Sequence, residues 1–144
     1  MEYILHLLIF ISVYTILAQS LSLTAGYAGL ISLAHVGFYG IGAYTAAILS
    51  VNYNLPFLVT LPLAMLLTGL IAIVVSTISL RTVDDYFIII TLGIQVAIFS
   101  VMNNWQGLTR GPLGIPGIPS IKILGFPFDT KISFLLLSLF FVGI

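Results

Sequence analysis

Residues 3–23 read YILHLLIFISVYTILAQSLSL, an apolar stretch without a charged side chain. The absence of charge continues to Leu80, so 78 consecutive positions carry none. A helix needs about 20 apolar residues to cross the roughly 30 Å hydrocarbon layer of a membrane. The run is long enough for more than one crossing. It predicts an all-α integral membrane protein, built as a multi-span helical bundle.

The composition of the chain excludes several other classes of protein. Only four basic and four acidic residues occur among 144, which is 6%, against about 25% in an ordinary soluble domain. Hydrophobic residues make up 60% and the mean hydropathy is +1.26. So few polar groups cannot cover a water-soluble domain or keep a disordered tail in solution. The net charge of zero offers no basic patch for nucleic acid,. The absence of cysteine excludes disulfides and thiolate metal sites,.

Polar and turn-forming segments divide the chain into apolar stretches. The separators are the Gly-rich segment 24–29, the Asn-Tyr-Asn segment 52–54, the charged turn 81–85 and the loop 103–131. Pro56 and Pro62 fall near the start of the third stretch, where proline is tolerated,. We expect spans at about 3–23, 34–51, 55–80, 86–102 and 132–144.

The fifth stretch, 132–144, is too short to cross a bilayer,. We therefore expect the chain to be the N-terminal part of a larger membrane protein, truncated in its fifth span. A natural short tail is the alternative. Residues 1–3 lack the basic segment of a signal peptide, so the first span is expected to be a retained helix,.

The loop 103–131 contains five glycines and four prolines. The repeated prolines in 111–119 exclude a continuous α-helix there. The loop is apolar between its turns, so we expect a structured segment that packs on the membrane face of the protein. Its candidate residues are Trp105, as an interfacial aromatic anchor, and Gly111, Pro112 and Gly114,.

Enzyme and metal motifs are missing from the sequence. No phosphate-binding G-x-x-x-x-G-K-[ST] loop occurs, and residues 37–42 have the wrong glycine order and the wrong context for a dinucleotide site,. The two histidines, His6 and His35, are 29 residues apart in the sequence. The chain is therefore predicted to have no catalytic residue, no metal site and no cofactor.

The second span is rich in small residues. Gly42, Ala46 and Ser50 repeat at every fourth position and share a helix face,. Small residues let membrane helices approach closely. Tight packing is one interpretation, and a backbone-lined path for a polar solute is another; the two are compatible. The candidates for solute path or helix packing are Gly26, Gly29, His35, Gly37, Gly40 and Gly42.

His35, the segment 26–29 and Gln95 can each be explained without a role in solute transport. His35 can be an interfacial histidine with a solvated ring, or it can face a solute path. The segment 26–29 can be irregular backbone at membrane depth, or a plain loop between spans. Gln95, in the middle of the fourth span, is expected to form a hydrogen bond between helices rather than to bind a ligand.

Three blocks of sequence resemble a known family. They are GYAGLISLAH (26–35) with GFYGIGAYT (37–45), Leu80-Arg81 with DYFIIITLG (85–93), and Asn104-Trp105 with LTRGPLGI (108–115). In this order they resemble the LivM-type permeases of branched-chain amino acid ABC importers. The departure is Arg110, where the family commonly has glycine.

The resemblance implies a function and a set of partners. The chain would cover roughly the first half of a permease, without the cytoplasmic segment that docks on the ATPase. The partners would be a second, LivH-like permease subunit, two ATPase subunits and a soluble substrate-binding protein. The solute would be a branched-chain amino acid or a related small polar solute such as urea or an amide. The location would be the inner (plasma) membrane. A stand-alone channel or secondary transporter, or a membrane scaffold, is the alternative.

The orientation in the membrane is open to two predictions. The turn 81–85 contains one basic residue and the loop 103–131 contains three, which by charge alone favours a cytoplasmic loop,. The resemblance implies the opposite, with Arg81 cytoplasmic and the Gly/Pro-rich loop extracytoplasmic. We follow the resemblance, because a difference of two charges is small.

Overall fold

The computed structural model of the chain describes residues 2–29, 31–79, 81–82, 84–118, 122–123, 126–127 and 131–143. Leu80, Ile144 and parts of the predicted loop at 119–121, 124–125 and 128–130 lie outside this set. The elements in chain order are α1 (Glu2–Ala28), α2 (His35–Asn52), α3 (Phe57–Ser79), α4 (Asp84–Asn104), α5 (Gln106–Thr109), η1 (Gly111–Leu113), β1 (Lys122–Ile123), β2 (Phe126–Pro127) and α6 (Lys131–Val142).

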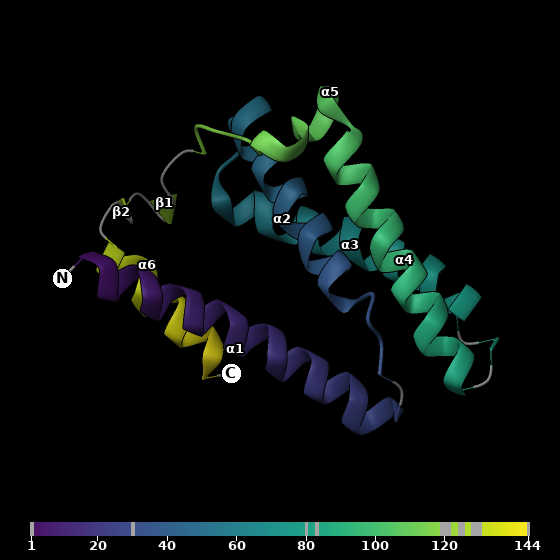
Figure 1. The fold of residues 1–144 in the computed structure, drawn as a ribbon. Coiled ribbons are helices and arrows are strands. Elements are labelled where there is room, and N and C mark those ends of the chain that lie inside the picture. Colours follow the sequence, from purple (N-terminus) through teal and green to yellow (C-terminus); the bar gives the residue numbers. More distant parts are fainter. Residues whose placement is uncertain are drawn as a thin grey trace.

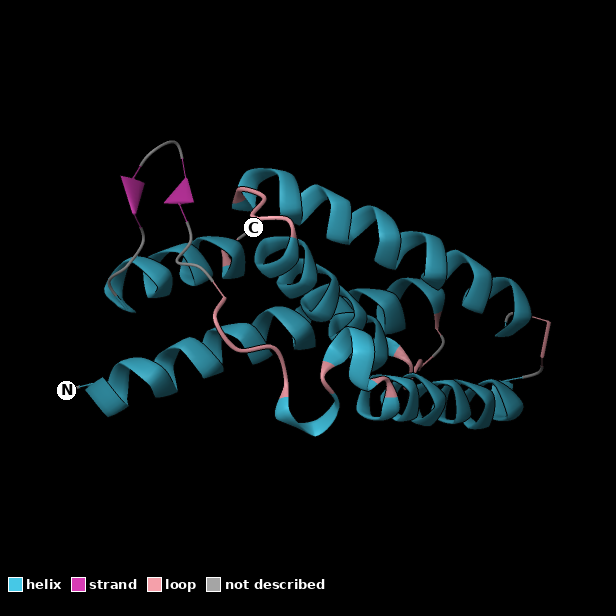
Figure 2. Cartoon of the chain, turned by 90° about the horizontal axis from the view of Figure 1, so that it is seen from above, coloured by secondary structure: helices cyan, strands magenta, loops and turns pink. Residues whose placement is uncertain are grey.

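Helices dominate the molecule, and the two short strands stand at one edge of it (Figure 2). Within the part of the chain that the structure describes, three helices have the length and composition to cross a membrane, namely α1, α3 and α4. The fold is therefore that of an all-α, multi-span membrane protein. The strands pair antiparallel, with Lys122 opposite Pro127 and Ile123 opposite Phe126. This hairpin lies in the segment expected to be a loop.

The helices form two groups. Helix α2 packs most extensively on α3 and also contacts α4, while α1 packs mainly on α6. In Figure 1 the α1–α6 pair lies apart from the α2–α4 group over much of its length. The connection between α1 and α2 and the turn at Arg81 lie at one end of the bundle, and α5 and η1 lie at the other (Figure 1).

Helix α2 has 18 residues and is not among the helices that meet the criteria for a membrane span. At 1.5 Å per residue it is about 27 Å long, slightly shorter than the roughly 30 Å hydrocarbon layer. Its glycines, alanines and tyrosines lower its hydropathy. Most of its residues from Gly40 to Val51 are half-buried, because α3 and α4 cover them. The predicted second span is thus the central helix of the described bundle.

The interior and the surface differ in polarity in the way expected of a membrane protein. Among the residues that the structure describes, six hydroxyl side chains but three apolar ones, Ala34, Ala64 and Phe87, are buried. Large apolar side chains, such as Leu66 and Phe99, lie on the surface. Surface hydrophobicity on this scale is what lipid accommodates and water does not. Several hydroxyls are satisfied within their own helix, for example Ser12 Oγ, which donates to Leu8 O at 2.8 Å,.

One predicted boundary is wrong. Helix α1 continues through the Gly-rich segment to Ala28, so Gly26 is helical and does not break the chain. One glycine costs a helix only about 1 kcal/mol, which is less than leaving backbone groups unsatisfied in lipid. Pro62 lies inside α3, in its second turn, and is thus near the start of the third span as predicted. The segment 111–119, predicted to be non-helical, contains the single 3₁₀ turn η1, which has a proline near its start as such turns tolerate,.

Candidate functional site

The connection between α1 and α2 is irregular backbone that reaches into the bundle. Gly29 ends α1 in the left-handed conformation, with φ of +67°, and its N–H donates to Ala25 O at 2.9 Å,. Four residues later, the Leu33 N–H donates to Thr91 Oγ1 at 3.2 Å. Thr91 is seven residues beyond the start of α4, so this contact lies about 10 Å along that helix,. Irregular backbone at such depth requires protein or a cavity around it. Protein surrounds this contact, because Thr91 and Ala34, the residue after Leu33, are both buried.

The first two turns of α2 face α4. A Cβ built on Gly37 would lie 2.8 Å from Gln95 Oε1 and 3.0 Å from Ile98 Cδ1. A Cβ on Gly40 would lie 3.3 Å from Met102 Sδ. These two glycines therefore let α4 side chains approach the α2 backbone. Whether this face also belongs to a solute path stays a prediction.

Gln95 does not behave as predicted. Its Oε1 is buried but has no hydrogen-bond partner among the residues that the structure describes. The expected hydrogen bond between helices is therefore absent at this oxygen, because the opposing position of α2 is a glycine and offers no side-chain donor. An unsatisfied buried polar atom costs about 1–3 kcal/mol.

Helix α3 repeats this arrangement on another side of α2. A Cβ on Gly42 would lie 3.4 Å from Thr68 Oγ1. That hydroxyl is also buried without a hydrogen-bond partner in the described part of the chain. By contrast, Thr60 Oγ1 donates to Pro56 O at 3.0 Å and Thr77 Oγ1 donates to Val74 O at 2.7 Å in the same helix. Thr68 is thus a threonine of α3 with an unused hydroxyl.

A cavity of about 360 Å³ lies between the two groups of helices. This α1–α2–α3 cavity brings His35 together with Thr68, whereas the glycines at 37, 40 and 42 are not among its lining residues. Its lining is Val13, Ile16, Leu17 and Ser20 of α1, His35, Phe38 and Tyr39 of α2, and Thr68 of α3. His35 is half-buried there, and as the first residue of α2 it lies where the irregular connection ends.

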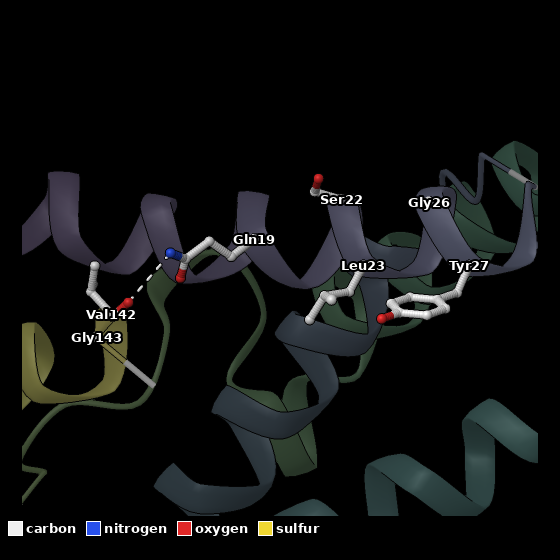
Figure 3. Close-up of a pocket in the computed structure, with 7 residues that line it drawn as sticks. All are labelled: Gln19, Ser22, Leu23, Gly26, Tyr27, Val142 and Gly143. Carbon is white, nitrogen blue, oxygen red and sulfur yellow. Dashed lines mark hydrogen bonds between the residues drawn. The ribbon is translucent and has the colours of Figure 1, made fainter.

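A second cavity of about 650 Å³ lies between α1 and α6 (Figure 3). Gly26 lines it, so this predicted residue faces a different space from His35. Gln19 Nε2 donates to Val142 O at 3.3 Å and joins the two helices at its edge. Among the described residues, no atom lies within 4 Å of a Cβ built on Gly29, which ends α1.

The loop after α4 is ordered around Thr109. The Thr109 side chain is buried; its Oγ1 lies within hydrogen-bond distance of Trp105 O (2.9 Å) and of Met102 O, and it accepts from the Gly111 N–H at 3.3 Å. Arg110 and Gly111 both adopt positive φ, +59° in each case. A Cβ on Gly111 would lie 2.8 Å from Asn103 O, so only glycine fits there.

The remaining loop candidates lie close by. Trp105 precedes α5 and is more than half exposed, a position compatible with the predicted interfacial anchor. Pro112 lies near the start of η1, where a missing N–H is tolerated,. Gly114 has φ of +67° and ψ of −175°, a combination that essentially only glycine adopts,.

Comparison with known proteins identifies the family. The family described as the branched-chain amino acid transport system permease component matches residues 3–144. This chain belongs to that family. The predicted resemblance to this family of permeases is thereby confirmed, and the chain is a multi-pass membrane protein.

Two curated permeases are similar to it over most of its length. The high-affinity branched-chain amino acid transport system permease protein LivM of Salmonella typhimurium is 38% identical over 119 residues, which are 83% of this chain and 28% of the relative. LivM of Escherichia coli strain K12 is 37% identical over 117 residues, 81% of this chain and 28% of the relative. The matched part is therefore 28% of each relative, not the expected half. No solved structure matches the chain.

Sequence reasoning missed the hydroxyl residues that organise this permease-family fold. Thr68, Thr91 and Thr109 were not singled out, because isolated threonines follow no helical or metal-binding pattern. Thr91 and Thr109 lie inside the blocks that resemble the family, and this position was the feature of the sequence that could have identified them. Thr68 lies outside all three blocks, and only the tertiary structure shows that it lines the same cavity as His35.

Proposed function

We propose that this chain is part of the permease subunit of an ATP-binding-cassette importer that passes branched-chain amino acids into the cell across the inner (plasma) membrane. The observation that carries the proposal is the family match over residues 3–144. It is supported by the similarity to two proteins named as branched-chain amino acid transport permeases. Urea, short amides and other amino acids remain the related substrates to test.

The physical task of such a subunit is to move a zwitterion through hydrocarbon. A charged group at the bilayer centre is strongly disfavoured, so the protein must offer a polar path that opens to one side at a time. The buried hydroxyls, among them those of Thr60 and Thr91, are polar groups held inside an apolar bundle. ATP binding and hydrolysis on partner chains shift the equilibrium between the two openings.

The proposed partners follow from this role. They are a second, LivH-like permease subunit, two ATPase subunits and a soluble substrate-binding protein, with the lipid bilayer around the permeases. The chain lacks a phosphate-binding loop of the G-x-x-x-x-G-K-[ST] type in its sequence, so the nucleotide is assigned to the separate ATPase subunits.

Purification of the tagged full protein from its native membrane tests the proposal. We expect an ATPase subunit and a second permease to copurify, and the complex in proteoliposomes to take up leucine only with ATP and the binding protein. Uptake driven by an ion gradient without ATP would favour a secondary transporter. A purified protein without an ATPase partner and without uptake would refute the proposal.

A further inference from the structure

We propose that the α1–α2–α3 cavity is a transit site for the aliphatic amino acid inside the membrane, with Thr68 and His35 as its polar contacts. The inference rests on the proposed function and adds the location and chemistry of the solute site to it. It starts from a cavity in which four helical residues of α1 face the α2–α3 pair.

The cavity lies at the depth at which a transit site is useful. Thr68 is the middle residue of α3, and the lining residues Val13 to Ser20 belong to the central part of α1. Both helices meet the criteria for a membrane span. Solute sites of many transporters lie near the bilayer midplane, where a site can be opened to either side in turn.

The lining matches a solute that is aliphatic at one end and polar at the other. Val13, Ile16, Leu17 and Phe38 form an apolar wall, and Ser20, His35, Tyr39 and Thr68 contribute hydroxyl or imidazole groups. Among these lining residues none is Asp, Glu, Lys or Arg. Such a lining accommodates a net-neutral amino acid with an apolar side chain. It offers no counter-ion to glutamate or lysine, whose additional charge would stay uncompensated.

Thr68 is the most informative residue of the site. Its hydroxyl has no acceptor in the described part of the protein, unlike the hydroxyls of Thr60 and Thr77 in the same helix. Threonine in a helix occupies two χ1 rotamers, so the hydroxyl can turn from Gly42 towards the cavity. There it can donate to a solute carboxylate. His35 is the first residue of α2, where a negative group is also favoured by the helix dipole,.

The size of the cavity sets a limit on the solute. About 360 Å³ is at the lower end of the roughly 300–1,000 Å³ typical of small-molecule sites. The space therefore suits one small amino acid and not a peptide. Enlarging an apolar wall residue should disfavour the larger branched side chains first.

The first experiment measures uptake by the full importer in proteoliposomes, with the binding protein saturated by leucine or by valine. Leu17→Phe should lower leucine uptake about tenfold more than valine uptake, since one methylene in an apolar pocket changes selectivity by this order. Leu66→Phe, on the exposed side of α3, is the control and should leave the ratio unchanged. An equal ratio of leucine uptake to valine uptake in the Leu17→Phe and Leu66→Phe variants would overturn the proposal.

The second experiment reads the site without transport. The chain contains no cysteine, so Thr68→Cys introduces a single thiol into it, and Ser20→Cys provides a second reporter if the first does not assemble. Saturating leucine should slow labelling by a small thiol reagent, and glutamate should not. Thr77→Cys, outside the cavity, should show no protection by either.

The outcomes separate this inference from the proposed function. Normal leucine uptake by the wild type, with no protection of either thiol, would overturn the transit site and leave the permease role intact. A wild type that neither takes up leucine nor copurifies with an ATPase would refute both.

Discussion

Gly37 of α2 lies directly against the Gln95 side chain of α4. A Cβ on Gly37 would lie 2.8 Å from Gln95 Oε1, and that oxygen has no hydrogen-bond partner in the described structure. The glycine thus makes room for a polar atom that the bundle does not otherwise satisfy. The obstructing atom is at the end of a flexible side chain. A Cβ at position 37 can therefore be accommodated, but only if the Gln95 side chain moves within the packed interface between α2 and α4.

Gly37→Ala is therefore expected to destabilise the protein by about 1–3 kcal/mol, the usual cost of overpacking. Gly93→Ala in α4 is the matched control, because no atom lies within 4 Å of a Cβ there; it should be neutral or stabilising by about 0.5–1 kcal/mol. The midpoint of thermal unfolding in detergent measures both. Adding Gln95→Ala to Gly37→Ala should recover part of the loss. Equal midpoints for the two glycine variants would contradict the assigned contact.

Gly111→Ala should be more harmful than Gly37→Ala, although the distance is the same 2.8 Å. At position 111 the obstructing atom is a backbone oxygen, Asn103 O, and φ is +59°. Neither can relax without moving the end of α4. The expected loss is about 2 kcal/mol or more, from the left-handed conformation and the clash together. Gly107→Ala, in the neighbouring α5 with open space around it, is the control in the same unfolding assay. A Gly111→Ala protein as stable as wild type would mean that the loop is built differently.

Arg110→Gly should stabilise the protein. Arg110 adopts φ of +59°, a conformation that costs a residue with a Cβ roughly 1–2 kcal/mol. The resemblance implies glycine at this position, and the left-handed backbone gives the physical reason. Arg110→Lys keeps the Cβ and a positive charge, so it separates the backbone effect from loss of charge. A higher unfolding midpoint for the glycine variant only is the expected result, and a lower one would show that the guanidinium makes a contact worth more than the strain.

Much of the fold could be predicted because a segment that crosses a membrane must be long, apolar and uncharged. Long uncharged runs predicted the helices, and small residues in α2 predicted close approach at Gly37 and Gly40. The end of α1 could not be predicted, since a Gly-rich segment can continue a helix where lipid penalises open backbone. Its terminus at Gly29 depends on a left-handed cap that no pattern distinguishes from Gly26.

The candidate site was predictable only in part. His35 was singled out because a histidine at membrane depth needs a reason, and it does line the α1–α2–α3 cavity. The cavity itself arises because α1 packs mainly on α6 and little on α2. That arrangement is a tertiary property, and so is the position of Thr68, which only the packing of α3 brings to the cavity.

The orientation of the bundle can be tested at two exposed positions. Leu113 in η1 and Arg81 are exposed, and they lie at opposite ends of α4. Thr109, in the same loop as Leu113, is buried and therefore less suitable for labelling. In a full protein whose cysteines outside these 144 residues are replaced, Leu113→Cys should react with a membrane-impermeant reagent from outside intact cells. Arg81→Cys should react only after the membrane is opened. The reverse pattern would show that the basic loop is cytoplasmic, as charge alone suggests.

Thr91 is expected to hold the irregular connection in place. Its hydroxyl donates to Ile88 O at 3.0 Å and accepts from the Leu33 N–H at 3.2 Å, and the side chain is 1% exposed. Thr91→Val keeps the shape but leaves the Leu33 N–H without its acceptor, which should cost about 1–3 kcal/mol. Thr91→Ser keeps the hydroxyl and should retain the hydrogen bond, losing only the methyl packing. Thr77→Val is the control for loss of a threonine hydroxyl, because the Thr77 hydroxyl bonds within its own helix.

Hydrogen exchange at the Leu33 N–H gives the specific readout. The exchange should accelerate in Thr91→Val and stay slow in Thr91→Ser, because only the first variant removes the acceptor. Equal exchange in the two would mean that the connection is held by the burial of Ala34 and not by this hydrogen bond.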